Sequence, residues 1–199
     1  GRQHYVLALT GDHGVAPIPE QVTALGVDAG RLDPADVRGR IESALAPFLG
    51  PEPQVAWAPY TEVYFAPGVM AKLRQMPEAA RSARGVARVF VGDDLARGAS
   101  ADDPDARAAV FGYVPERSGD LILLPKAHWI PTAAATTHGT LYLYDARVPL
   151  LLVGPGIKAG SYLGSVTPAD IAPTLAHLTG ITLPRTDGRV LSEALEPPS

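Results

Sequence analysis

The chain has 199 residues, of which 46% are apolar and 19% charged, so it is an ordinary globular protein and not a disordered one. The formal net charge of −4, with no run of Lys or Arg, excludes a nucleic-acid-binding surface, and no apolar stretch approaches the ~20 residues of a membrane-spanning helix. Cysteine is absent, so any metal ion must be held by His and carboxylate side chains.

The first predicted element covers residues 4–14. Its apolar run predicts a buried strand, covered on both faces as in the centre of an α/β sheet. The strand ends in a turn flanked by Gly11 and Gly14, which presents Asp12 and His13 side by side. A divalent metal ion explains this pair well, because it offsets the desolvation of both groups. The competing interpretation is a simple turn in which Asp12 caps Gly14 and His13 is half-exposed.

Residues 15–118 have a different sequence pattern from the segments on either side and predict an inserted α+β subdomain, a cap beside the main sheet. Asp33 and Pro34 supply an N-cap and a first helical position for a helix over 35–49. Further elements are expected as strands at 54–57, 62–65 and 87–91 and a helix at 68–81. The aromatic residues of this region are typical of packing, with Tyr60 and Tyr64 also candidates for the border of a substrate cleft.

Residues 119–199 return to an α/β pattern and, with residues 1–14, are expected to form the core: a mostly parallel sheet covered by helices. Strands are predicted at 120–125 and 148–153, and a helix at 167–178 that Gly180 stops. His138 lies in a polar loop, where open α/β sheets place ligand sites. Taken alone, a loop histidine of this kind is more often simply solvated.

Four sequence motifs, in order along the chain, resemble those of the alkaline phosphatase superfamily. The first two are T-G-D-H-G at 10–14 and R-S-G-D at 117–120. The third begins with H-G-T at 138–140 and continues through Y-D and V-P-L to G-P-G-I at 154–157. The fourth is D-I-A-P-T-L at 170–175, followed by D-G-R-V-L at 187–191. The likeness is to the PafA-like alkaline phosphatases and the type I phosphodiesterase–nucleotide pyrophosphatase branch. It extends over almost the whole chain.

This resemblance implies a phosphoester hydrolase with two divalent ions, usually zinc, and a Thr or Ser nucleophile. It implies that Asp12 and His13 ligate one ion and that His138 ligates the other. In the family the nucleophile and the remaining ligands precede the D-H-G motif, and residues 1–10 contain none of them. We therefore expect a C-terminal portion that has no catalytic residue of its own, binds zinc weakly and does not hydrolyse phosphate esters without the missing N-terminal part. The resemblance also implies a periplasmic or secreted protein.

Two other functions remain open. The first is a non-catalytic module that keeps this scaffold and binds a ligand or partner through the inserted region. The second is a sulfatase or phosphoglycerate mutase of the same superfamily. His4, His128 and His177 are expected to be structural or solvated. The sequence does not separate monoesterase from diesterase activity, because in the family that choice depends on the cap and on groups near the nucleophile, which precede the D-H-G motif.

Overall fold

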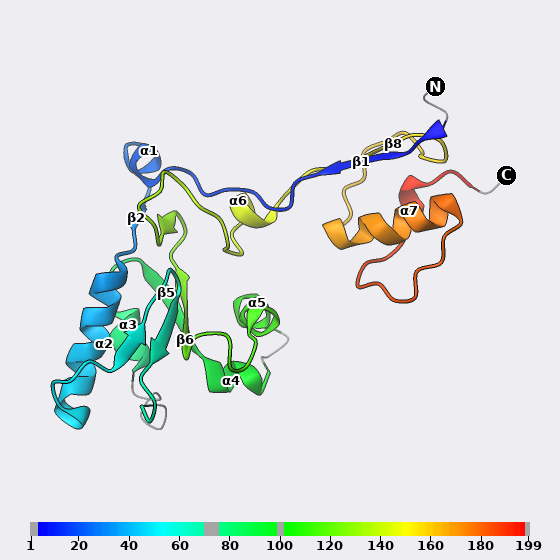
Figure 1. Cartoon of the computed structure of the whole chain (residues 1–199). Helices are drawn as coiled ribbons and strands as arrows, with labels where there is room; N and C mark the ends of the chain where they lie inside the picture. Colours follow the sequence, from blue (N-terminus) through cyan, green and yellow to red (C-terminus); the bar gives the residue numbers. More distant parts are fainter. Residues whose placement is uncertain (1–3, 70–75, 99–101, 198–199) are drawn as a thin grey trace. The chain divides into compact units, whose positions relative to one another are not determined.

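The computed structural model describes residues 4–69, 76–98 and 102–197. The chain divides into two compact units (Figure 1). The terminal unit contains residues 1–14 and 147–199, and the central unit contains residues 15–146. No helix within the described ranges is long and apolar enough to cross a membrane.

In the terminal unit, the strand expected at 4–14 is the shorter β1 (Leu7–Thr10), which pairs antiparallel with β8 (Leu150–Val153). Leu7 lies opposite Val153 and Leu9 opposite Leu151, so the four side chains share one face. Each of them is at least half exposed, at 51–59%. The expectation of a strand buried on both faces therefore does not hold within this unit. An apolar run shows that burial is favourable, but it does not show which element provides it.

The helix expected at 167–178 is confirmed as a short 3-10 turn, Pro168–Asp170, followed by α7 (Ile171–Thr179). Asp170 closes a capping box with Thr167, and Gly180 ends the helix in the left-handed conformation at φ 71°. The tail then returns to the helix, because the Arg189 N–H donates to Asp170 Oδ1 at 2.8 Å. The Leu191 N–H likewise donates to the buried Thr174 hydroxyl at 3.0 Å.

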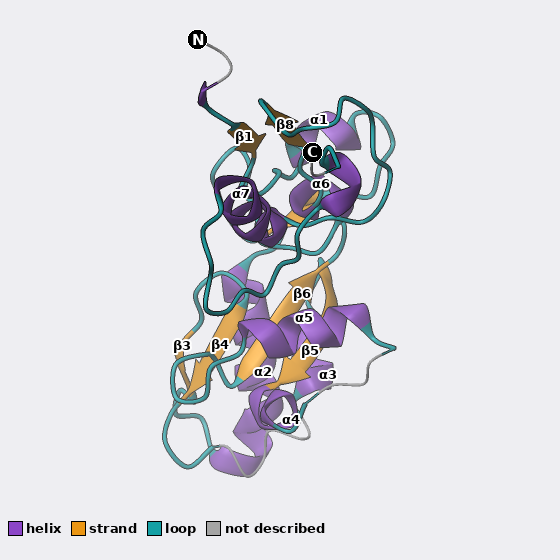
Figure 2. Ribbon diagram, turned by 90° about the vertical axis from the view of Figure 1, so that its right-hand side faces the viewer, coloured by secondary structure: helices purple, strands orange, loops and turns teal. Residues whose placement is uncertain are grey.

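The central unit is built on an antiparallel sheet in the order β3-β4-β6-β5. The strands are β3 (Val55–Trp57), β4 (Glu62–Phe65), β5 (Val86–Val91) and β6 (Leu121–Pro125). Helices α2 (Pro34–Leu49) and α3 (Pro77–Arg81) cover one face, and α5 (Pro104–Gly112) lies over the other (Figure 2). The main core forms under α2, where Val37, Ile41 and Leu45 are buried against the sheet.

The local predictions for the inserted region are confirmed. Asp33 accepts a hydrogen bond from the Ala35 N–H at 2.8 Å and begins α2 at Pro34. The strands predicted at 54–57, 62–65 and 87–91 correspond to β3, β4 and β5. The helix predicted at 68–81 is confirmed only as α3; residues 70–75 lie outside the described ranges, and Gly68 and Val69 are not helical.

The strand predicted at 120–125 has a different place from the expected one. We expected it in the α/β core, but as β6 it lies between β4 and β5 in the sheet of the central unit. Its alternate residues are buried, which fits a strand between two layers equally well in either sheet. Residues 119–146 consequently group with the inserted region in the central unit.

The remaining elements of the central unit are short. They are α1 (Pro19–Thr23), β2 (Gly30–Arg31), α4 (Gly92–Ala96), β7 (Trp129–Ile130) and α6 (Leu143–Ala146). The β2–β7 pair is parallel, whereas the other named strand pairs of the described residues are antiparallel. The described strands therefore do not pair with one another in the mostly parallel way that we expected.

Candidate metal centre and hydrolytic site

The turn after β1 brings a carboxylate and an imidazole together. The backbone N–H of His13 donates to Asp12 Oδ1 at 3.0 Å, and the ring nitrogen His13 Nδ1 lies 2.7 Å from the Gly14 carbonyl oxygen. On the other side of the ring, His13 Nε2 lies 3.7 Å from Asp12 Oδ2. Both side chains are accessible, at 41% for His13 and 90% for Asp12.

These two residues fit part of a metal coordination shell. When Nδ1–H donates to the Gly14 carbonyl, the neutral ring carries its lone pair on Nε2, the arrangement that orients metal-binding histidines. Two ligands of a tetrahedral zinc ion at ~2.0–2.1 Å lie about 3.3 Å apart. The 3.7 Å between Asp12 Oδ2 and His13 Nε2 is close to that spacing. Within the described residues no group of three His, Asp or Glu side chains gathers as a metal site, so the pair supplies two ligands and not a complete shell.

His138 lies in a loop of the central unit that is fixed on both sides. Before it, the Ala16 N–H donates to the Thr137 carbonyl at 2.9 Å, and the Thr136 hydroxyl donates to the Ala16 carbonyl. After it, the N–H and hydroxyl of Thr140 donate to Asp145 Oδ2 at 2.9 and 2.6 Å. The His138 side chain is exposed and lines a cleft of about 130 Å³.

Asp145 is a site residue that the sequence reasoning did not single out. Its side chain is only 3% exposed, yet Oδ1 has no hydrogen-bond partner among the described residues. It lines the same cleft as His138, together with Tyr60 and Tyr144. Burial raises the pKa of the Tyr144 phenol. The available signal was the spacing H-G-T-x4-D, in which the Asp follows the Thr by five residues.

The structure therefore brings Asp12 and His13 together in the terminal unit and places His138 in the central unit. The other histidines fit the structural or solvated roles expected for them. His4 and His177 are exposed, and the His128 ring packs 5.1 Å from the Tyr144 ring.

Comparisons with known proteins agree with the resemblance that the motifs indicate. No protein-family model matches the chain. Alkaline phosphatase PhoD of Zymomonas mobilis is 33% identical over 94% of this chain, and alkaline phosphatase PhoK of a Sphingomonas species is 32% identical over 94% of it. The crystal structure of alkaline phosphatase PafA, a protein known from Elizabethkingia meningoseptica, matches 98% of the chain with a TM-score of 0.80 and 26% identity.

The chain belongs to the alkaline phosphatase superfamily. It covers 36% and 37% of the lengths of PhoD and PhoK, and 39% of the PafA structure, so it spans little more than a third of each. The structural match confirms the α/β class and the alkaline-phosphatase-like fold that the motifs predicted. The antiparallel strand pairs described above are pairs that the described residues of this chain form with one another.

Proposed function

We propose that the chain is part of a metal-dependent phosphoester hydrolase of the alkaline phosphatase or phosphodiesterase type. In this proposal Asp12 and His13 hold one divalent ion, zinc being the first candidate, and His138 holds a second. The observation that carries it is the 3.7 Å spacing of Asp12 Oδ2 and His13 Nε2. It occurs in a chain that is similar over 94% of its length to a curated alkaline phosphatase.

The residues of the chain would orient these ligands. The Gly14 carbonyl fixes the His13 ring, and Asp145 fixes the turn that follows His138 through Thr140. Divalent ions at such residues supply a lowered pKa for an oxygen nucleophile and neutralise charge on the phosphoryl group. Positioning of this kind matters because partners behind metal ligands typically contribute about 10- to 100-fold in affinity or activity.

We also propose that the intact enzyme has an N-terminal part that supplies the nucleophile and the remaining ligands, and that the 199-residue chain alone is inactive. The short coverage of the relatives supports this, at 36–37% of their length. The exposed apolar face of β1 and β8, made by Leu7, Leu9, Leu151 and Val153, supports it as well, because such a face is normally covered. By the same resemblance we propose a periplasmic or secreted location.

The test compares the 199-residue chain with a protein extended upstream along its reading frame. We expect the extended protein to bind zinc and to hydrolyse p-nitrophenyl phosphate, and the shorter chain to show no turnover. In the extended protein, His138→Ala and Asp12→Asn should each reduce kcat/KM by at least about 100-fold, since even indirect positioning partners contribute about that much. The matched control is His177→Ala, an exposed histidine of α7 that should leave kcat/KM unchanged.

Two results would contradict this function. Robust turnover by the 199-residue chain that His138→Ala abolishes would show that the chain is an enzyme without an N-terminal part. An extended protein that folds but neither binds zinc nor hydrolyses the ester would favour the non-catalytic module on the same scaffold.

A further inference from the structure

A second, larger cavity lies in the central unit beside the His138 cleft. It has a volume of about 310 Å³, at the lower end of the range for small-molecule pockets. One wall is the sheet face opposite the main core, where Phe90 of β5 lies opposite Ile122 of β6. A second wall is α5, and a third is the loop 139–141 that directly follows His138.

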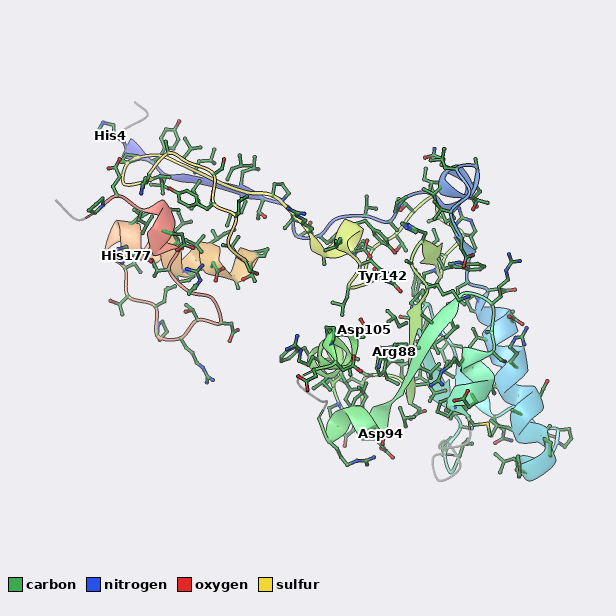
Figure 3. The ribbon with its side chains drawn as sticks, turned by 180° about the vertical axis from the view of Figure 1, so that it is seen from behind. His4, Arg88, Asp94, Asp105, Tyr142 and His177 are labelled. Carbon is green, nitrogen blue, oxygen red and sulfur yellow. The ribbon has the colours of Figure 1, made fainter. Side chains whose placement is uncertain are left out.

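The sequence of α5 explains why this space is open. The helix presents Asp105, Ala108, Ala109 and Gly112 to the cavity, at positions i, i+3, i+4 and i+7 of one helical face. Two alanines and a glycine leave the space that larger side chains would fill. The beginning of α5 is held to the sheet, because Arg88 of β5 donates to Asp103 at 2.8 and 2.6 Å and to Asp105 at 2.9 Å. Figure 3 shows Arg88 and Asp105 between the strand and the helix.

The cavity and the His138 cleft adjoin each other. They share four lining residues, Thr61, Pro125, Gly139 and Thr140. The cleft also contains the buried Asp145, whose Oδ1 has no partner within the described residues. The loop that carries His138 therefore lines both the cleft, which contains His138 and Asp145, and the mainly apolar cavity.

The charges of the wall limit what the cavity can hold. Its carboxylates already have partners, since Asp105 pairs with Arg88 and Glu62 accepts from the Tyr64 hydroxyl. None of the described lining residues is Lys, Arg or His, so a negatively charged group would find no counter-charge there. Phe90, Ile122 and Leu124 offer apolar surface instead.

We propose that this cavity takes the uncharged, apolar organic group of a phosphoester whose phosphoryl end lies at His138. The proposal rests on the proposed function and names the substrate class for that site. An engineered cavity of about 150 Å³ accommodates benzene. The 310 Å³ observed here is therefore large enough for a one- or two-ring aromatic group.

The first experiment needs neither metal nor hydrolysis. 2-Naphthol, an uncharged two-ring alcohol, is titrated into the full 199-residue chain by calorimetry. We expect saturable binding that Ala109→Leu weakens at least about 10-fold, because the added side chain occupies the cavity. The matched control is Ala96→Leu at the exposed end of α4, which should bind like the unchanged chain. No binding, or equal binding by the two variants, would overturn the proposal.

A second variant guards against loss of folding. A Cβ built on Gly112 meets no atom within 4 Å, and alanine favours the helix, so Gly112→Ala should fold. It should weaken 2-naphthol binding about threefold, since it adds a smaller group than Ala109→Leu. Unchanged binding in a folded Gly112→Ala chain would count against this cavity as the binding site.

The last measurement separates the cavity from the hydrolytic function. In the protein extended upstream, kcat/KM is measured for 2-naphthyl phosphate and for methyl phosphate. We expect a preference for the naphthyl ester that Ala109→Leu reduces and Ala96→Leu keeps. Hydrolysis of both esters with a ratio that Ala109→Leu leaves unchanged would overturn the cavity proposal. Failure to hydrolyse either ester, with 2-naphthol still bound, would instead overturn the proposed function.

Discussion

Two buried aspartates should respond very differently to the same substitution by asparagine. Asp170 uses both carboxylate oxygens, since Oδ1 accepts from the Arg189 N–H and Oδ2 from the Thr167 N–H, each at 2.8 Å. Asp145 uses one oxygen, because Oδ2 accepts both bonds from Thr140 while Oδ1 has no partner among the described residues. An asparagine has a single acceptor oxygen, so it can replace Asp145 but must lose one bond at position 170.

The expected magnitudes follow from these bonds. A hydrogen bond to a charged group contributes about 1.5–3 kcal/mol, and at position 170 the amide NH₂ would also face a backbone N–H. We expect Asp170→Asn to cost about 2–3 kcal/mol, which corresponds to about a 30- to 150-fold change in an opening equilibrium. Asp145→Asn keeps its acceptor, and its amide group replaces an oxygen that has no partner among the described residues, so we expect a smaller cost of about 1 kcal/mol.

Amide hydrogen exchange measures the stability change from each substitution within the unit that contains the substituted residue. Protection of the Arg189 and Leu191 amides reports on the Asp170 contacts, and protection of the Thr140 amide reports on Asp145. Both tryptophans, Trp57 and Trp129, lie in the central unit, so urea unfolding followed by tryptophan fluorescence should not respond to Asp170→Asn. Asp187→Asn, an exposed aspartate in the same segment, is the matched control. A loss from Asp145→Asn as large as that from Asp170→Asn would refute the reasoning.

Two further predictions concern stability. Gly39→Ala should stabilise the central unit by about 0.5–1 kcal/mol, because the residue lies within α2 and an added Cβ meets no atom within 4 Å. Gly188→Ala should instead cost about 1–3 kcal/mol, because its Cβ would collide with the Ala169 backbone. Thermal unfolding of the two variants checks that the two changes in stability have opposite signs. Arg88 holds the pKa of the Asp103 carboxyl well below its usual 3.8, so the stability from this pair is present above about pH 4 and is lost as the pH falls. Urea unfolding between pH 5 and 2 should show this loss, and Arg88→Met should reduce the pH dependence while Arg107→Met, an exposed control, keeps it.

The parts of the fold that the sequence predicted depend on neighbouring residues. The pair Asp33-Pro34 begins α2, and Gly180 ends α7, because caps and stops act over one helical turn. The same signal at Asp103-Pro104 begins α5, where Asp103 accepts from the Ala106 N–H at 3.0 Å. The sequence analysis predicts no helix there, although the physical cue is the same.

The parts that were not predicted depend on partners far along the chain. β1 and β6 are both short apolar runs, and such a run does not specify which strand will pair with it or which face will be covered. β6 pairs with β4 and β5, while β1 pairs with β8 and leaves one face exposed. Asp145 differs from these strands, because its partner Thr140 lies only five residues before it and the contact depends on the local turn between them.

The hydrogen bonds also separate the structural from the chemical residues within the family-like motifs. In D-I-A-P-T-L, both polar side chains are occupied by the backbone, since Asp170 accepts from Arg189 and the Thr174 hydroxyl accepts from Leu191. The motifs at 170–175 and 187–191 are thus two sides of one contact, in which the buried Asp170 and Thr174 side chains are engaged. In H-G-T, by contrast, Thr140 and Asp145 fix the turn, and His138 remains exposed in the cleft. These contacts give Asp170 and Thr174 a structural role, whereas the proposed metal ligands Asp12, His13 and His138 are exposed.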